Sequence, residues 1–147
     1  MKLSTRTRYG TRALLELALQ KTGEPVALKD IAAHQQISLS YLEHLVAPLI
    51  AAGIIRSTKG PRGGISLVKK LADIKLIDIV RVLEGPLAPV ECVENEQVCE
   101  RSGTCAARDI WSQLEDVMCD FLGKTSLKDM ADRQKSKTGK ESTMYYI

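Results

Sequence analysis

The chain has 147 residues, a formal net charge of +3 and a hydrophobic content of 44%. This length allows one modest domain or a small domain with an oligomerisation arm, and we expect no separate catalytic domain. No apolar run reaches membrane-spanning length, and basic residues from Lys2 to Arg12 interrupt the stretch where a signal peptide would lie. We therefore expect a cytoplasmic protein.

The charge is divided unevenly along the chain. Residues 1–70 contain eleven Lys and Arg against four Asp and Glu, whereas residues 71–125 contain five against eleven. A basic front half beside an acidic back half indicates a nucleic-acid surface on one side of the molecule. At this point the alternative is ordinary variation of surface charge.

The first half of the chain predicts three helices in succession. Apolar residues recur at helical spacing from Ser4 to Lys21. A short second helix is centred on Ile31, and a third runs from Ser40 to Gly53. Ser40 and Glu43 form a capping-box pattern, which places the start of the third helix at Ser40.

A β-hairpin and a fourth helix follow. Residues 54–58 and 65–68 have strand character and are joined by a glycine-rich loop, and Leu76–Glu84 predicts a helix that ends before Gly85. Together these elements predict a mainly α fold with a winged helix-turn-helix DNA-binding domain in residues 1–85. A small α+β unit that binds no ligand is the alternative.

Candidate DNA contacts follow from this arrangement. Short polar side chains on the exposed face of the third helix can reach base edges, and cations in the hairpin loop suit a narrow minor groove. Two arginines near the start of the first helix can clamp phosphates. Glu43 either completes the helix cap or accepts a hydrogen bond from cytosine. The predicted DNA-binding residues are Arg6, Arg8, Ser38, Ser40, Tyr41, Glu43, His44, Lys59 and Arg62.

Three of the four cysteines lie within fifteen residues, from Glu91 to Cys105. This segment is polar and acidic, so no apolar face explains why the cysteines cluster. Thiols stay reduced in the cytoplasm, and the pattern therefore indicates a metal or redox site before a disulfide framework. The spacing C-x6-C-x5-C differs from the C-x2-C pairs of structural zinc sites, which favours an iron–sulfur cluster. Zinc or another metal, and a metal-free thiol switch, are the alternatives.

A long apolar stripe follows the cysteines. It recurs at three- and four-residue steps and needs a partner that a domain of this size hardly supplies. We expect a twin helix from a second chain, with packing against the first helix as the alternative. The predicted dimerisation residues are Ile110, Trp111, Leu114, Val117, Met118 and Phe121. Residues 86–106 are assigned to a cluster-binding loop, 107–132 to the dimerisation helix and a short C-terminal helix, and 133–147 to a flexible basic tail.

Four segments together resemble the IscR/NsrR-type family of winged-helix transcriptional regulators. They are MKLSTRTRYGTRALLELA, SLSYLEHLVAPLIAAGIIRSTKGPRGG, DIVRVLEGP and the cysteine segment. The resemblance reaches about residue 132 and is strongest in the helix and wing. It implies a homodimer that binds roughly palindromic double-stranded DNA and is not an enzyme. It also implies an iron–sulfur cluster, [2Fe-2S] favoured over [4Fe-4S], on Cys92, Cys99 and Cys105.

The resemblance leaves the fourth ligand open. Relatives place a histidine shortly after the third cysteine or an acidic residue on the first helix, and the matching positions here are Arg108 and Arg8. Cys119 lies about 21 Å along a helix from Cys105, so we interpret it as a surface or packing thiol. The remaining candidates are Asp109, Glu91, Glu96, a residue of a second subunit and an external small ligand.

We therefore expect a repressor or dual regulator whose operator affinity responds to the iron–sulfur cluster. The alternative is a cluster-free repressor of the same fold, regulated by thiol redox chemistry or by a partner. An iron–sulfur enzyme or electron carrier is less expected, because the sequence contains no recognisable catalytic set.

Overall fold

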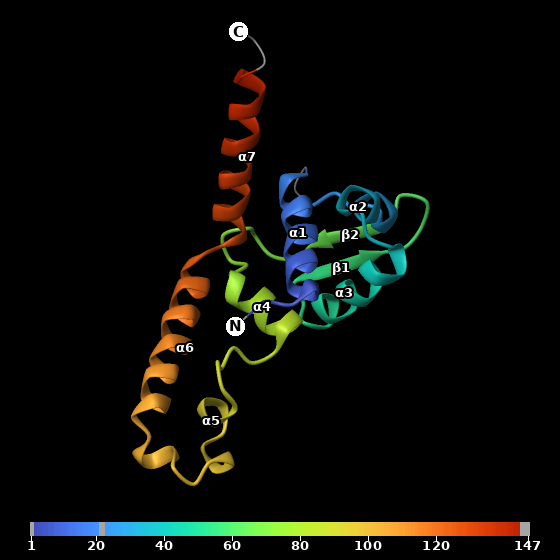
Figure 1. The fold of residues 1–147 in the computed structure, drawn as a ribbon. Coiled ribbons are helices and arrows are strands. Elements are labelled where there is room, and N and C mark those ends of the chain that lie inside the picture. The colour runs from blue at the N-terminus through green and yellow to red at the C-terminus, as the bar shows by residue number, and fades with distance from the viewer. Residues whose placement is uncertain (1, 21–22, 145–147) are drawn as a thin grey trace.

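The computed structural model describes residues 2–20 and 23–144, with side-chain environments as far as residue 139. This part contains seven α-helices and a small antiparallel sheet, and the sheet lies beside α1, α2 and α3 (Figure 1). Helix α1 (Thr5–Leu19) lies at the centre. It packs against α2 (Leu28–Gln35), α3 (Leu39–Ala51) and the sheet on one side, and against α4 (Leu76–Glu84) and α7 (Leu127–Met144) on the other.

The main core lies where α1 to α4 meet the sheet. Its side chains come from the apolar stripes that the helical spacing predicts, and Leu14, Ile31, Leu42 and Leu49 are at most 1% exposed. Burial of such side chains supplies most of the free energy of folding. The predicted mainly α fold with a winged helix-turn-helix is confirmed.

The start of α3 differs from the prediction. Its N-terminal cap is Ser38, whose Oγ accepts a hydrogen bond from the Tyr41 N–H at 3.1 Å, so the predicted Ser40–Glu43 capping box was wrong. With Ser38 as the cap, Ile37 before it and Leu42 after it both reach the core, which fixes the angle at which the chain enters the helix. Ser40 therefore lies inside the first turn.

The wing is a hairpin of β1 (Ile55–Thr58) and β2 (Gly64–Leu67), in which Thr58 pairs with Gly64. Val26 exchanges two backbone hydrogen bonds with Ile65, so the chain before α2 lies along β2. Gly64 has a φ of 158°, and a Cβ there would lie 2.1 Å from the Val26 carbonyl oxygen. Glycine is needed at this position because the two backbones are in close contact.

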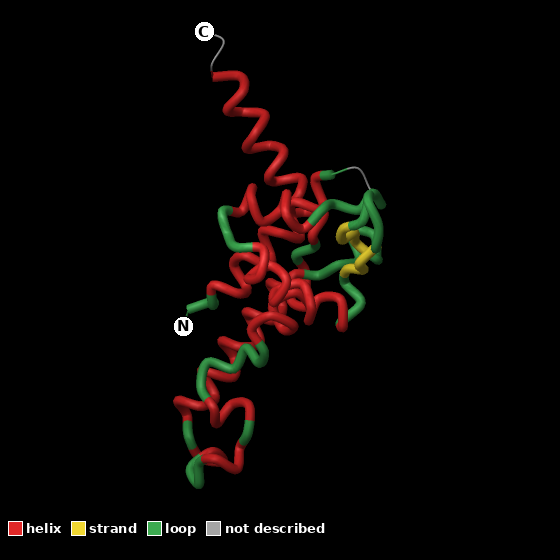
Figure 2. Tube along the Cα trace, turned by 90° about the vertical axis from the view of Figure 1, so that its right-hand side faces the viewer, coloured by secondary structure: helices red, strands yellow, loops and turns green. Residues whose placement is uncertain are grey.

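Residues 91–124 form an elongated arm. Residues 91–94 form the short helix α5 (Glu91–Glu94), and α6 (Ala106–Lys124) returns beside α4. Figure 2 shows the cysteine-containing end of this arm and the end of α7 at opposite extremes of the molecule. No helix in the described residues is long and apolar enough to cross a membrane.

Helix α7 is longer than predicted. Leu127 and Ala131 at its start are buried beside α1, and the Leu127 N–H donates to the Ile74 carbonyl oxygen at 2.8 Å. The predicted helix end near residue 132 was wrong, because α7 continues to Met144. Its first turn is held by the core, and once a helix is nucleated each further residue adds to it at little cost. The last part of the predicted tail, residues 145–147, lies outside the described residues.

Candidate nucleic-acid interface and cysteine segment

The first turns of α3 present polar side chains to solvent. Ser38, Ser40, Glu43 and His44 are exposed, and Tyr41 is half-buried. The opposite face carries Leu42, Leu45, Val46 and Leu49, which are all buried. The structure thus brings the five predicted α3 residues to one accessible end of the helix, as a recognition helix requires.

An aromatic pair joins this end of α3 to α1. The rings of Tyr9 and Tyr41 meet edge to face with their centroids 6.3 Å apart. The guanidinium carbons of Arg8 and Arg12 lie 4.9 and 5.5 Å from the Tyr9 ring centroid, within the range of a cation–π contact. The cations of α1 therefore flank the recognition helix. Our sequence reasoning missed Tyr9 and Arg12, although the four-residue step from Arg8 to Arg12 was visible.

The tip of the wing is exposed and basic. Lys59 and Arg62 are both solvent-accessible, and the turn between them closes through a hydrogen bond from the Gly63 N–H to the Gly60 carbonyl oxygen at 2.9 Å. Arg56 on β1 donates from Nε to the buried Ser66 Oγ at 3.2 Å. Arg56 is a further exposed cation on the wing that the sequence did not single out.

Glu84 connects the end of α4 to the start of α1. Its carboxylate accepts hydrogen bonds from the Ser4 N–H at 3.0 Å, from the Ser4 Oγ at 2.8 Å and from the Thr7 hydroxyl. The Thr7 hydrogen bond, followed by those from Ser4, lowers the pKa of Glu84 against the opposing effect of burial. The turn that carries Arg6 is thus attached to the last residue of α4, from which residues 85–90 lead into the cysteine segment.

The cysteine segment is less irregular than predicted. Cys92 lies in α5, Cys99 directly follows a 3₁₀ turn at Glu96–Val98, and Cys105 caps the start of α6. All three are free thiols; Cys99 is exposed and the other two are half-buried. Among the described residues, no three Cys, His, Asp or Glu side chains form a group that could hold a metal ion. The thiols share a segment but do not converge in this conformation.

Arg108 holds this segment against α6. Its Nε donates to the Cys92 carbonyl oxygen at 2.8 Å, and its Nη2 lies 2.6 Å from the Glu96 carboxylate. The Arg108 side chain is 16% exposed, whereas that of Glu96 is 73% exposed. The side chain at the position where relatives place a histidine therefore fastens the polypeptide of the segment, and Glu96 is paired with it.

One polar residue of the cysteine segment is buried. Ser102, in a 3₁₀ turn at Ser102–Thr104, is 8% exposed, and its hydroxyl has no hydrogen-bond partner among the described residues. No pattern in the sequence singles out this serine. Cys119 is half-buried on α6 and receives a weak hydrogen bond from Arg81 Nη2 at 3.7 Å, as expected of a packing thiol.

Helix α6 leaves its apolar stripe open. No residue of α6, all of which the structure describes, is fully buried, and Ile110, Val117 and Phe121 are 57%, 67% and 59% exposed. Leu114 and Met118 are half-buried. Trp111 is 41% exposed, so the six predicted dimerisation residues all retain accessible surface.

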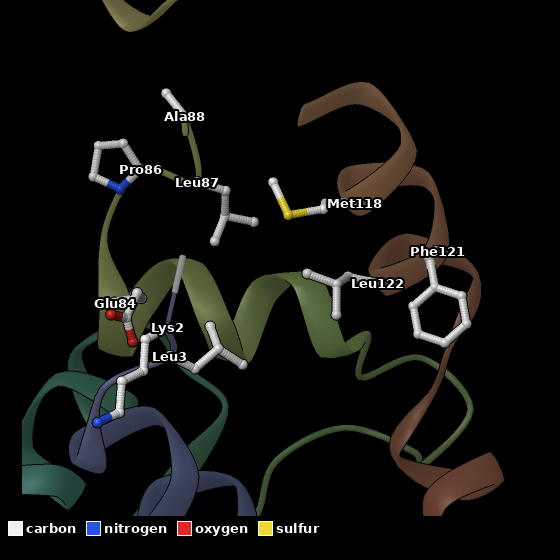
Figure 3. Close-up of a pocket in the computed structure, with 9 residues that line it drawn as sticks. All are labelled: Lys2, Leu3, Glu84, Pro86, Leu87, Ala88, Met118, Phe121 and Leu122. Atoms are coloured by element: carbon white, nitrogen blue, oxygen red, sulfur yellow. The ribbon is translucent and has the colours of Figure 1, made fainter. Parts of the chain in front are cut away.

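Beside this stripe lies an open, mostly apolar pocket of about 430 Å³ (Figure 3). Leu3, Leu87 and Met118 point into it from the N-terminal segment, the segment after α4 and α6 respectively. Glu84 forms part of its polar edge. The exposed apolar surface therefore extends from α6 onto the DNA-binding half.

A winged helix-turn-helix with a polar recognition helix and a basic wing defines a DNA-binding transcriptional regulator. The family model for Rrf2, described as an iron-dependent transcriptional regulator, matches residues 3–133. The chain belongs to the Rrf2 family. The resemblance noted in the sequence is thereby confirmed.

Individual relatives agree with this assignment. The protein rrf2 of Nitratidesulfovibrio vulgaris is 45% identical over 130 residues, covering 88% of this chain and 87% of its own. CymR of Bacillus subtilis is 39% identical over the whole of both chains. Its structure, described as that of the global cysteine regulator, superposes with a TM-score of 0.76 over 90% of this chain and 98% of the CymR chain. The structure of T. potens IscR, 33% identical, has a TM-score of 0.73 over 99% and 97%. CymR and two IscR proteins among the relatives are named as transcriptional regulators rather than enzymes.

Proposed function

We propose that this chain is a homodimeric DNA-binding regulator whose operator affinity responds to an iron–sulfur cluster on Cys92, Cys99 and Cys105. The observation that carries the proposal is the position of three free thiols in the one segment that joins α4 to α6. The description of the family as iron-dependent supports it. The same segment connects the DNA-binding half to the helix with the exposed apolar stripe.

The residues of the segment fit such a cluster in kind. Thiolates are its usual ligands, and Ser102 adds a buried hydroxyl that lacks a partner among the described residues. The thiols would have to be drawn together on binding, because they do not form a group here. When bound, the cluster would supply a redox-active centre that can be lost or oxidised.

A conformational change in the cysteine segment would reach the proposed DNA contacts through two connections. One runs through Glu84, whose hydrogen bonds to Ser4 and Thr7 hold the start of α1 and hence Arg6 and Arg8. The other runs through α6, which Arg108 ties to the backbone of Cys92. A shift of α6 within a dimer changes the distance between the two recognition helices, which must match half-sites about one DNA turn apart.

The proposed dimer interface is the exposed stripe of α6, continued by the apolar pocket. A large, contiguous apolar surface is unusual on a monomer and is typical of a protein–protein interface. The proposed DNA contacts are the exposed residues of α3, the start of α1 and the wing, with Arg12 added because it flanks Tyr9. Cations dominate affinity through the phosphates, whereas the α3 side chains give sequence preference.

Anaerobic purification with iron and sulfide assays and an absorbance spectrum tests the proposal. The wild-type chain should contain iron and acid-labile sulfide, and Cys92→Ala, Cys99→Ala and Cys105→Ala should each lose them. Cys119→Ala is the matched control, because this thiol faces α4 and should leave the cluster intact. Loss of cluster in Cys119→Ala, or retention in all three other variants, would contradict the ligand set.

A cluster-free thiol switch is the second candidate. It is favoured by the separate positions of the three thiols and by the full-length match to CymR, described as a global cysteine regulator. This alternative predicts colourless protein after anaerobic preparation with iron and sulfide supplied. It also predicts that a mild oxidant changes DNA binding of the wild type but not of a variant lacking the three cysteines.

A further inference from the structure

We infer that Tyr9 is a positioning residue for DNA binding, which holds two arginines of α1 beside the start of α3; this inference rests on the proposed DNA contacts. The guanidinium carbons of Arg8 and Arg12 lie 4.9 and 5.5 Å from the Tyr9 ring centroid. On the recognition helix, the Tyr41 ring meets the same ring edge to face at a centroid distance of 6.3 Å. One aromatic side chain thus contacts two cations of α1 and the first turn of α3.

Close packing of α1 on α4 fixes the place of this ring. Gly10 is buried in α1, and a Cβ at this position would collide with the buried Leu83 side chain of α4. Such tight packing restricts rotation of α1 about its own axis. Tyr9, next to Gly10, is half-buried, whereas Arg8 and Arg12 are exposed. The ring therefore lies at the border between the core and the basic surface.

No carboxylate in the described part of the chain neutralises these two arginines. The four ion pairs among the described residues involve neither Arg8 nor Arg12. Glu16, the acidic residue of α1, lies one turn beyond Arg12, but its carboxylate is 2.6 Å from His34 Nδ1 and accepts a hydrogen bond from Gln35 Nε2 at 2.8 Å. The ring contact therefore orients the two cations and leaves their charges available to another anion.

A guanidinium group can contact a ring and an anion at the same time. The ring attracts its flat face, whereas its N–H groups lie in the plane of the group and remain able to donate. A DNA phosphate accepts such hydrogen bonds in a forked geometry. Because Arg8 and Arg12 both contact one ring, they are close enough to each other to bind phosphates of the same DNA strand.

The benefit of the ring is entropic. An arginine side chain loses conformational freedom when it binds a phosphate, and this loss opposes binding. The Tyr9 ring restricts both side chains before DNA binds, so less freedom is lost on binding. Removing the ring leaves both positive charges in place, and the number of released counterions should stay the same. The positioning role therefore predicts weaker binding with an unchanged salt dependence.

The test measures fluorescence anisotropy of the full-length chain, purified anaerobically, with a labelled duplex that the wild type has selected from a random-sequence pool. Tyr9→Leu, with Tyr9→Met as a second ring-free variant, should bind about fivefold more weakly with the wild-type log–log salt slope. Tyr9→Phe keeps the ring and should bind within about twofold of the wild type. Arg8→Ala is the control for loss of the cation itself and should also lower the slope by about 0.9.

A double-mutant cycle separates positioning from a merely structural role. In protein that already contains Arg8→Ala and Arg12→Ala, Tyr9→Leu should weaken binding by less than about twofold, since no cation is left to position. Equal losses in both backgrounds would overturn the inference, because Tyr9 would then act through the fold. It would also be overturned if Tyr9→Phe bound as weakly as Tyr9→Leu, because the hydroxyl would then be responsible.

Failure of the proposed DNA contacts gives a different result. If Arg8→Ala and Arg12→Ala both bind the duplex as the wild type does, these arginines do not contact DNA, and the proposed contacts of α1 fail together with the inference. If the arginine variants bind weakly but Tyr9→Leu binds like the wild type, the contacts stand and only the inference fails. If the wild type selects no duplex, the proposed function itself is wrong.

Discussion

The two halves of this molecule differ in how they use apolar side chains. We call α1 to α4 with the hairpin the body, and residues 91–124 the arm. The body encloses Leu14, Leu42 and Ile65 almost completely, whereas the arm exposes most of Val117 and Phe121. The body is basic and stabilised by its own core. The arm is acidic, and its apolar stripe is largely exposed. This contrast supports the proposal that the arm binds a second copy along α6 and a ligand at its cysteine-containing end.

The largest expected effect is on the body. Leu42→Ala removes a fully buried side chain and should lower the free energy of unfolding by about 2 to 5 kcal/mol, at every protein concentration. Denaturant unfolding followed by circular dichroism measures it. Val117→Ala is the matched change in the arm, and its effect should appear only where the protein concentration supports a dimer. If Val117→Ala lowered the free energy of unfolding equally at every protein concentration, the proposed contrast between body and arm would be contradicted.

The second prediction concerns the stripe of α6. Phe121→Glu places a charge on its exposed apolar surface and should produce a monomer in light scattering at micromolar concentration. Operator affinity should fall about 100-fold, because the two half-sites are then no longer bound as a linked pair. Gln113→Glu adds the same charge off the stripe and should remain dimeric. A dimeric Phe121→Glu would exclude this surface as the interface.

The third prediction separates the cations of the body from those of the arm. Arg62→Ala removes an exposed charge from the wing tip and should weaken operator binding by roughly three- to tenfold, with a log–log salt slope smaller by about 0.9. Arg101→Ala, which removes an exposed arginine from the arm, should leave both values unchanged. Fluorescence anisotropy at several salt concentrations measures them. Equal effects of the two changes would argue against a wing–phosphate contact.

The smallest effect is expected where body and arm join. Glu84→Gln weakens the hydrogen bonds to Ser4 and Thr7 and should cost about 1 kcal/mol of stability at pH 7. Because folding lowers the pKa of Glu84, its contribution is fully present above the ordinary value of 4.5 and is lost as the pH falls through the lowered pKa. The stability difference between wild type and Glu84→Gln should therefore persist to about pH 4.5 and shrink below it. A difference that stays constant in acid would exclude the ionised carboxylate as its source.

Much of the body was predictable because its signals are local. Leu76–Glu84 has the predicted bounds, since its apolar spacing and the following Gly85 define both the helix and its end. The N-terminal cap of α3 could not be predicted in this way, because Ser38 and Ser40 are both good capping residues. The choice between them depends on Ile37 and Leu42 reaching a core that other segments build.

The arm shows which features local sequence signals predict and which they do not. The sequence by itself determined that three thiols lie in one polar segment and that an apolar stripe follows, because both are matters of residue type and spacing. Only the tertiary structure decided that Arg108 fastens the backbone of Cys92 and that Glu84 joins α4 to α1. It also decided that the buried Ser102 hydroxyl has no hydrogen-bond partner within the described part of the chain. Each of these depends on groups separated in the chain or on burial by the folded segment. Spacing along the sequence does not report such distances.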